Sequence, residues 1–422
     1  MILTSNRFCV ILMQKGCCMD LIKRDDYIQW LNRYRDKQLI KAITGLRRVG
    51  KSKIFELYIE ALQKDGVSAD QIILINFEEM ENEPFREKTA LYRHILSKVQ
   101  PNKMLYVFLD EIQVVQGFEE VVDSLFVKPN IDVYITGSNA KFLSSEIATV
   151  LTGRYVEINV LPLSFKEYSE HYKFMGKDKR ALFMDYITYG AMPGMTMFDL
   201  GSSEQREYIE GVYKTILEKD VLKRNSRAGK QLVEHILSYL IYNIGCLTTV
   251  KRITDYINSN AARVAYNTVD SYFDTLQDCY FIYKADRYDV VGKEYLKLIH
   301  KYYVTDFGFK YYILNNKTVE IPQILENLIF LELKRRRFKV ATGKVDDKEV
   351  DFIVKDTSDQ IKYIQVAVTV LEEEKLKQEL RPFYEIKDNY PKYIITLDDY
   401  FVPDHDGVKT INAIDFLSGR EI

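Results

Sequence analysis

Eight residues near the start of the chain have the types and spacing needed to bind a phosphate group. They read Gly45-Leu46-Arg47-Arg48-Val49-Gly50-Lys51-Ser52, the P-loop pattern G-x-x-x-x-G-K-S. Its two glycines let the backbone turn and approach an anion, so that N–H groups of the loop and of the next helix face phosphate. The Lys51 ammonium can reach the β- and γ-phosphates of a nucleotide, and the Ser52 hydroxyl can hold Mg²⁺. We expect Gly45, Arg48, Gly50 and Lys53 to belong to the same site. An ordinary glycine turn is the alternative.

Two adjacent acids end an apolar run further along the chain. Residues 104–109 are apolar, and Asp110 and Glu111 follow them directly. Doubly wound sheets bind their ligands where the carboxyl ends of the strands emerge. Asp110 can therefore hold Mg²⁺, mostly through water, and Glu111 can orient and deprotonate an attacking water. A buried strand that ends at an acidic surface turn is the alternative, and the P-loop pattern upstream favours the chemical interpretation.

Three polar residues after the next apolar run are further candidates. Ser138 and Asn139 follow residues 131–137 and could sense the terminal phosphate, although a cap or a turn uses the same residue types. Arg154 could stabilise transferred phosphate charge, in its own subunit or in a neighbouring one. A salt-bridged surface arginine is the alternative.

A parallel sheet is needed to bring these residues together. Short apolar runs alternate with helical patterns at residues 38–44, 71–77, 104–109, 131–137 and 155–163. Alternation of this kind predicts a doubly wound parallel sheet of the α/β class. The helical spacing of residues 53–62, directly after the P-loop pattern, supplies the helix whose N-terminus faces the phosphate.

The middle of the chain predicts three helices and a hairpin. The helices span residues 231–243, 249–257 and 265–276, and the strands span residues 280–288 and 296–304. This order predicts a winged helix-turn-helix. Its third helix would begin with Arg263, Tyr266, Asn267 and Thr268, and in DNA-binding versions that helix enters the major groove. The same helix carries Asp270, Asp274 and Asp278, which would repel phosphate, so packing against protein stays an equal alternative.

Composition limits the remaining possibilities. The 422 residues have a formal net charge of −2, so any nucleic-acid binding must use a local basic patch. Five cysteines without a C-x-x-C pair and five scattered histidines predict neither a disulfide framework nor a zinc site. The apolar run at residues 8–13 is too short to span a bilayer, so we expect a cytoplasmic protein without a membrane partner. We also expect residues 1–18 to be dispensable, because Met19 offers a second start.

Several of these segments together resemble the AAA-type P-loop ATPases of bacteria and archaea. The resemblance rests on residues 45–52, 109–113, 136–140, 151–155 and 161–168. The chain is most similar to the prokaryotic family in which this ATPase precedes a C-terminal domain of unknown function, and the similarity runs from about Met19 onward. It implies an ATPase domain over residues 19–200, a helical linker with a winged helix over residues 201–305, and a small α/β domain over residues 306–422.

The last of these regions resembles the PD-(D/E)xK nuclease, or restriction-endonuclease-like, fold. A helix at residues 324–337 carries Glu326, and strands at residues 348–354 and 361–370 carry Asp351 and Gln365. In active members the third strand supplies E-x-K, which completes a metal site for phosphodiester cleavage. This chain has Gln365-Val366-Ala367 there, and Ala367 cannot replace the lysine. We therefore expect a degenerate site of Glu326, Asp351 and Gln365 that does not cleave.

The combined patterns predict a protein that binds and hydrolyses ATP with Mg²⁺. Its C-terminal domains would couple the nucleotide state to binding of DNA or of a protein partner. A nucleotide-dependent binding switch with little turnover and an ATP-gated nuclease are the alternatives. Assembly with further copies of the chain is a third kind of partnership, because AAA-type sites often lie between subunits.

Overall fold

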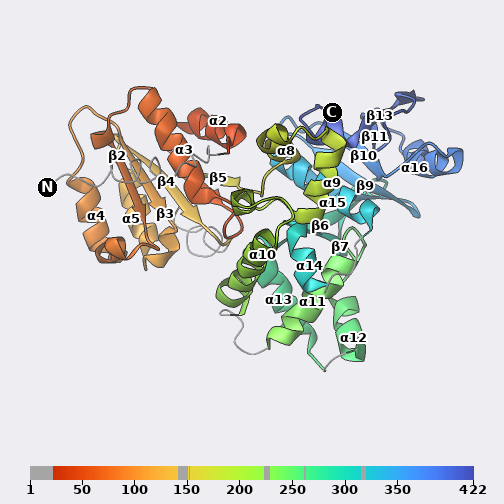
Figure 1. Ribbon diagram of the computed structural model, residues 1–422, viewed down its shortest axis with the longest axis horizontal. Coiled ribbons are helices and arrows are strands. Elements are labelled where there is room, and N and C mark those ends of the chain that lie inside the picture. The colour runs from red at the N-terminus through yellow and green to blue at the C-terminus, as the bar shows by residue number, and fades with distance from the viewer. Residues whose placement is uncertain (1–21, 141–150, 152, 223–228, 261–262, 315–319) are drawn as a thin grey trace.

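Two β-sheets, connected by helices, make up the computed structural model of the protein (Figure 1). The structure describes residues 22–140, 151, 153–222, 229–260, 263–314 and 320–422. Residues 1–18, which the sequence predicts to be dispensable, lie outside this part of the chain. The smaller sheet lies on the left of Figure 1 and the larger one on the right, with α8 and α10 between them.

The smaller sheet contains the P-loop pattern and the acidic pair. Its strands are β1 (Ile40–Thr44), β2 (Ile72–Asn76), β3 (Leu105–Asp110), β4 (Ile131–Gly137) and β5 (Tyr155–Asn159). All neighbours pair in parallel in the order β2-β3-β4-β1-β5. β1, β3 and β4 are buried along their whole length, which explains their continuous apolar sequences. The predicted doubly wound α/β class is confirmed for this region.

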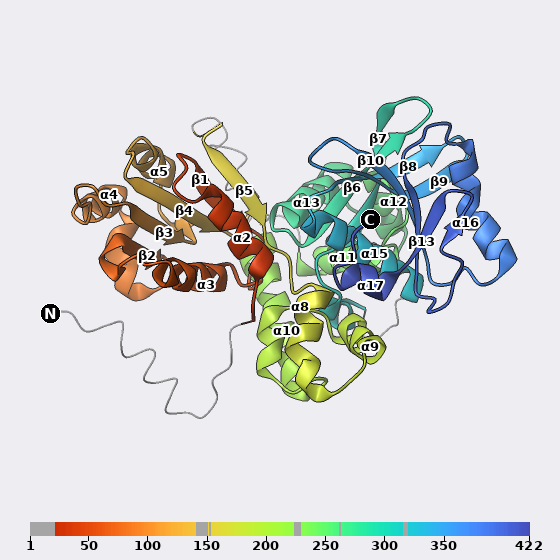
Figure 2. The ribbon, with the colours of Figure 1, turned by 90° about the horizontal axis from the view of Figure 1, so that it is seen from above.

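Helices cover both faces of this sheet. α2 (Asp25–Tyr34) and α3 (Lys51–Lys64) pack on one face, where Trp30 and Phe55 share a core with Phe108. α4 (Lys88–Leu96) and α5 (Phe118–Phe126) pack on the other face. β5 forms the edge that faces the rest of the molecule in both ribbon views (Figures 1 and 2). Segments that follow β5 can therefore contact the strand that precedes the P-loop.

Helices carry the chain from the first sheet to the second. They are α8 (Phe165–His171), α9 (Lys179–Tyr189), α10 (Ser203–Ile216), a π-helical turn η6 (Leu217–Leu222), α11 (Lys230–Tyr242), α12 (Val250–Asn260) and α13 (Tyr266–Asp278). The hairpin of β6 (Ile282–Asp289) and β7 (Glu294–Val304) follows α13. The three helices and the hairpin predicted for the middle of the chain are thus present, and their assignment as a winged helix stays a prediction.

The larger sheet joins this hairpin to the C-terminal strands. The later elements are α14 (Lys310–Ile313), α15 (Ile321–Arg335), β8 (Lys339–Val345), β9 (Lys348–Lys355), β10 (Ile361–Ala367), α16 (Glu373–Glu385), β11 (Lys392–Thr396), β12 (Asp404–His405), β13 (Val408–Asn412) and α17 (Ala413–Leu417). The strand order is β12-β13-β11-β10-β9-β8-β6-β7. Residues on both sides of the predicted boundary at 305–306 therefore share one sheet, and the division into two domains stays a prediction.

The apolar side chains of α15 fix it on one face of the larger sheet. Phe330 stacks on Tyr303 with a centroid distance of 4.1 Å, and Phe352 of β9 packs against both rings. α16 covers the opposite face through Leu380 and Phe383. Among the described residues, no helix combines the length and apolar character needed to cross a membrane.

Candidate nucleotide site and a second buried charge cluster

The P-loop pattern forms the turn between β1 and α3. β1 ends at Thr44, and α3 begins at Lys51 with Gly50 as its N-cap. Gly45 and Gly50 have φ values of +143° and +94°, which residues other than glycine rarely adopt. A Cβ on Gly45 would lie 2.4 Å from the carbonyl oxygen of Val160. The glycine positions of the pattern are therefore required by the backbone path as well as by any ligand.

Lys51 lies in the turn with its ammonium held by three acceptors. Its Nζ donates to the carbonyl oxygens of Gly45 at 3.1 Å and Leu46 at 3.4 Å, and it lies 3.3 Å from Oε1 of Glu111. Only 4 % of Lys51 is exposed. The two carbonyls orient the ammonium without neutralising it, because they carry only partial charge. The carboxylate of Glu111 is its single anionic partner among these contacts.

Asp110 ends β3 beside the first turn of α3. Its Oδ1 accepts a hydrogen bond from the hydroxyl of Thr136 at 2.5 Å. Burial raises the pKa of Asp110, although hydrogen bonds with Ser52 and Thr136 oppose the shift. Ser52 is itself exposed, so its hydroxyl faces both Asp110 and solvent. A hydroxyl and a carboxylate side by side are hard oxygen ligands of the kind Mg²⁺ prefers, and these two residues fit that ion.

Glu111 follows Asp110 in the left-handed backbone region, with φ at +54°. Its N–H donates to the hydroxyl of Thr136 at 2.8 Å, so Thr136 holds both acids of the pair in place. Burial alone would raise the pKa of Glu111, but Lys51, Gln113 and Arg47 together lower it below its ordinary value. Glu111 is thus an ionised carboxylate at neutral pH. Sequence reasoning missed the bridging role of Thr136. The only feature of the sequence that could have indicated this role is a hydroxyl residue near the end of a buried apolar strand.

The two arginines of the turn contact residues from other parts of the chain. Arg47 donates to Oδ2 of Asp220, in the π-helical turn η6, at 2.9 Å and to Oε1 of Glu78 at 2.9 Å. Arg48 is exposed and has a hydrogen bond to Tyr208 of α10. η6 and α10 therefore contact the turn directly. Asp220 is a second residue that sequence reasoning missed, since the contact spans 173 positions.

The other predicted nucleotide-site residues differ in their placement. Ser138 and Asn139 are buried and directly follow β4, at the same carboxyl edge as Asp110. Lys53 instead directs its ammonium to Oε2 of Glu56 at 2.6 Å. Arg154 precedes β5, and its carbonyl accepts from the N–H of Ile40 at the start of β1.

Arg154 therefore lies at the amino edge of the sheet, opposite the P-loop. Its guanidinium forms an ion pair with Asp123 of α5. Because the length of β1 separates Ile40 from Gly45, a role for Arg154 at the site of its own subunit does not fit this placement. A role at the site of a neighbouring subunit stays a prediction.

A second cluster of buried charges lies between the hairpin and the C-terminal strands. Lys301 of β7 is 2 % exposed, and its Nζ lies 2.9 Å from Oε1 of Glu326, 2.5 Å from Oε1 of Glu349 and 3.6 Å from Oδ1 of Asp351. The N–H of Asp351 donates to Oε1 of Gln365 at 2.7 Å. The structure thus brings together Glu326, Asp351 and Gln365, the three predicted residues of the degenerate nuclease-like site.

The lysine of this cluster comes from the second strand of the hairpin, which sequence reasoning assigned to the winged helix and not to the nuclease-like site. Ala367 leaves the third strand without a lysine, whereas Lys301 reaches the same carboxylates from the hairpin. One ammonium cannot balance three carboxylates, and the pKa of Asp351 is raised by burial and then by Glu326. Among the described residues, no group of three or more His, Cys, Asp or Glu side chains is arranged to hold a metal ion. The residues present therefore do not fit a catalytic metal, and the nuclease-like assignment stays a prediction.

Comparisons with known proteins agree with the geometry of the first site. Residues 37–169 match the model of an AAA domain, and residues 180–320 match a domain of unknown function, DUF8612. Among solved structures, the Walker-type ATPase PABY2304 of Pyrococcus abyssi is similar with a TM-score of 0.51 and 16 % identity. The match covers 70 % of this chain and 96 % of that one. Residues 37–169 therefore have the fold of a P-loop ATPase domain of the AAA type, which supports nucleotide binding.

Two relatives extend over most of the chain. An uncharacterized protein of Haemophilus influenzae is 35 % identical over 94 % of this chain and 98 % of its own length. An uncharacterized protein of Methanocaldococcus jannaschii, MJ1544, is 30 % identical over 85 % of this chain and 82 % of its own length. The chain belongs to the same family as these bacterial and archaeal proteins.

Proposed function

We propose that the protein is a Mg²⁺-dependent ATPase whose nucleotide state controls the binding of DNA or of a protein partner. The observation that supports hydrolysis is the meeting of Lys51, Ser52, Asp110 and Glu111 at the carboxyl edge of one parallel sheet. Each group has the chemistry that phosphoryl transfer to water needs. Mg²⁺ held by Ser52 and Asp110 would neutralise charge on the phosphates.

The ion pair of Lys51 with Glu111 indicates how the site responds to nucleotide. Without a phosphate, the ammonium of Lys51 is shared between Glu111 and two backbone carbonyls. A triphosphate offers Lys51 a more highly charged partner, so the ammonium turns toward it and Glu111 loses its cation. A carboxylate without its cation is a stronger base, which suits Glu111 to accept a proton from water as the phosphate arrives.

Contacts at the edge of the sheet support coupling to the later domains. The N–H of Ala140, which directly follows Ser138 and Asn139, donates to the carbonyl of Asp278 at the end of α13. The hydroxyl of Tyr283 in β6 donates to Oδ1 of Asn159 in β5 at 2.6 Å. A shift of the residues after β4 on nucleotide binding would therefore move α13, the helix that would contact DNA in a winged helix.

Steady-state hydrolysis of ATP with Mg²⁺ tests this function, with and without duplex DNA. We expect turnover in the wild type and a loss of about 100-fold in Glu111→Gln, which keeps the size of the side chain but cannot accept the proton. Lys53→Ala is the matched control, because its ammonium pairs with Glu56 on the outer side of the same helix. Equal rates in the wild type and Glu111→Gln would contradict hydrolysis by this site. If duplex DNA does not change the rate of hydrolysis, a protein partner should be tested next.

A nucleotide-dependent switch with little turnover is the second candidate. The placement of Arg154 favours it, because this arginine pairs with Asp123 at the far edge of the sheet. Removing a transition-state arginine slows related enzymes by about 10³–10⁵-fold. Tight binding of ATP with negligible turnover in both the wild type and Glu111→Gln would favour the switch.

A further inference from the structure

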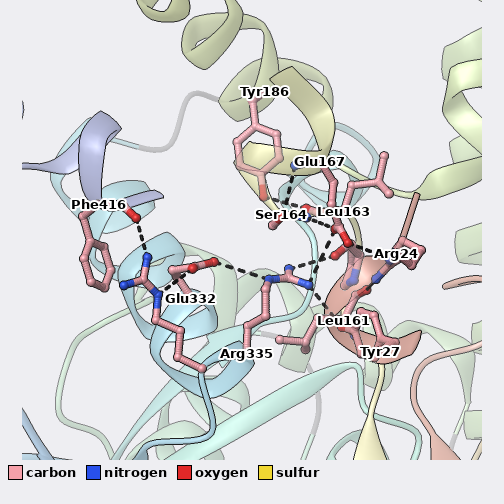
Figure 3. Close-up of polar contacts among 12 residues, drawn as sticks. Arg24, Tyr27, Leu161, Leu163, Ser164, Glu167, Tyr186, Glu332, Arg335 and Phe416 are labelled. Carbon is pink, nitrogen blue, oxygen red and sulfur yellow. Dashed lines mark hydrogen bonds and ion pairs between the residues drawn. The ribbon is translucent and has the colours of Figure 1, made fainter. Parts of the chain in front are cut away.

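A network of buried charged side chains connects the P-loop turn with α15 of the C-terminal region, and Figure 3 shows the part of it between Arg24 and Arg335. It begins at Arg24, which precedes α2 and is 4 % exposed. Arg24 donates from NH1 to the carbonyl of Val49 at 3.4 Å and from NH2 to the carbonyl of Leu161 at 2.8 Å. Its Nε lies 2.9 Å from Oε1 of Glu167. One side chain thus holds the P-loop turn, the segment after β5 and the first turn of α8.

Glu167 is the anion at the centre of this network. Its Oε2 accepts from the N–H of Ser164 at 2.7 Å, and the Ser164 hydroxyl accepts from the N–H of Glu167, which makes a capping box for α8. Burial alone would raise the pKa of Glu167, but Arg24 and Arg335 lower it below its ordinary value. Glu167 is therefore ionised, and its position depends on arginines from both ends of the chain.

Arg335 reaches this network from the last turn of α15. Its NH2 donates to the carbonyl of Pro162 at 2.8 Å, and its NH1 donates to the hydroxyl of Tyr27 at 3.2 Å and lies 4.0 Å from Oε2 of Glu167. Its Nε lies 3.4 Å from Oε2 of Glu332, one turn back on the same helix. The guanidinium thus bridges α15 to the segment after β5 and to α2, as Figure 3 shows.

The segment that Arg335 and Arg24 both hold borders the P-loop turn. The N–H of Val160 donates to the carbonyl of Thr44 at 2.7 Å, and Thr44 directly precedes Gly45. The carbonyl of Val160 is also the atom that leaves no room for a Cβ on Gly45. Residues 160–162 therefore form one wall of the turn, and their position depends on Arg24 from one side and on Arg335 from the other.

We propose that Arg335 is a positioning residue through which the C-terminal region sets the affinity of the P-loop turn for nucleotide. The inference deepens the proposed function, and it rests on that function only for the binding of ATP. Removing Arg335 leaves Glu167 with one cation and Pro162 without its donor, so the wall of the turn is free to shift. Because coupling between two sites is reciprocal, bound nucleotide must equally change how firmly α15 is held.

The test measures the dissociation constant of mant-ATP with Mg²⁺ by fluorescence titration of the full chain. We expect Arg335→Met to raise it about fivefold or more, a typical size for coupling between sites. Arg335→Lys should recover part of the affinity, because lysine keeps the positive charge but lacks the planar guanidinium that donates to several acceptors at once. Arg336→Met is the matched control on the same helix. Both arginines contact Glu332, but the other contacts of Arg336 run to the carbonyls of Arg420 at 2.7 Å and of Phe416, away from residues 160–162. This variant should stay within about twofold of the wild type.

Hydrogen exchange of the wild type provides a second readout that does not depend on the variants folding. Peptides from α15 should exchange more slowly with ATP bound than without it. Unchanged exchange of α15, or equal affinities in the wild type and a folded Arg335→Met, would overturn the inference. Binding without turnover in the wild type would count against the proposed ATPase activity alone. Absence of mant-ATP binding in the wild type would overturn both.

Discussion

Two buried lysines, Lys51 and Lys301, have similar exposure and opposite surroundings. Lys51 is 4 % exposed and faces one carboxylate and two carbonyl oxygens in a turn whose next residue, Ser52, is open to solvent. Lys301 is 2 % exposed and faces Glu326, Glu349 and Asp351 on the larger sheet. The first lysine is paired with one carboxylate next to a solvent-exposed residue, whereas the second lysine faces three carboxyl groups.

This difference separates a binding site from a structural cluster. An ammonium that donates to backbone carbonyls can exchange these contacts for a phosphate, because its interaction with the charged phosphate is stronger. An ammonium among several carboxylates has nothing to gain from a new anion, and the carboxylates already hold their cation. We therefore propose that Lys51 binds nucleotide and that Lys301 stabilises the fold.

Substitution of Lys301 should have the largest effect on folding. In Lys301→Met the carboxylates of Glu326, Glu349 and Asp351 lose their shared cation, and we expect the free energy of unfolding to fall by about 3–5 kcal/mol. Urea denaturation measures this change. Lys344→Met is the control, because Lys344 pairs with Asp289 at a more exposed position and should lose under about 1 kcal/mol. A loss in Lys301→Met as small as in the control would contradict a structural role.

Substitution of Lys51 should instead act on ATP. In Lys51→Met we expect the dissociation constant of mant-ATP to rise about 100-fold, or about 2.7 kcal/mol, because a buried charge contact with phosphate is lost. The folded Lys301→Met should bind ATP within about twofold of the wild type. Lys53→Met, two positions later in α3 with its ammonium on Glu56, should also leave binding unchanged. If Lys51→Met binds ATP as tightly as Lys53→Met does, the comparison of the two lysines fails.

Most residues of the first candidate site are close in sequence, which makes them easier to place than Lys301 of the second cluster. Gly45 to Ser52 are contiguous, and their spacing alone defines a strand, a turn and a helix. Asp110 and Glu111 could be placed beside them because carboxyl ends of parallel strands share an edge. Lys301 could not be found this way, because its partner Glu326 lies 25 positions later, in another element.

The same limit explains the other misses. Arg154 directly precedes β5, and only the register of β5 with β1 shows that it lies at the far edge of the sheet. Arg24 and Arg335 are separated by most of the chain, so their shared contact with Glu167 leaves no pattern in the sequence. Most helices and strands, by contrast, follow from local periodicity and lie within a few residues of their predicted bounds.

The pH dependence of stability provides the finest test of the cluster around Lys301. Glu379 of α16 accepts from Nε2 of Gln365 at 3.1 Å, and burial raises its pKa from 4.5 to about 7. The folded state therefore keeps a proton between these pH values that the unfolded state releases, so the free energy of unfolding falls as pH rises through this window.

Glu379→Gln removes the titration and keeps an acceptor for Gln365. We expect the variant to match the wild type near pH 4 and to exceed it by about 2 kcal/mol at pH 8 in urea denaturation. A difference that does not grow between these two pH values would mean that Glu379 is already ionised in the folded protein, and that the excess negative charge assigned to this cluster is balanced elsewhere.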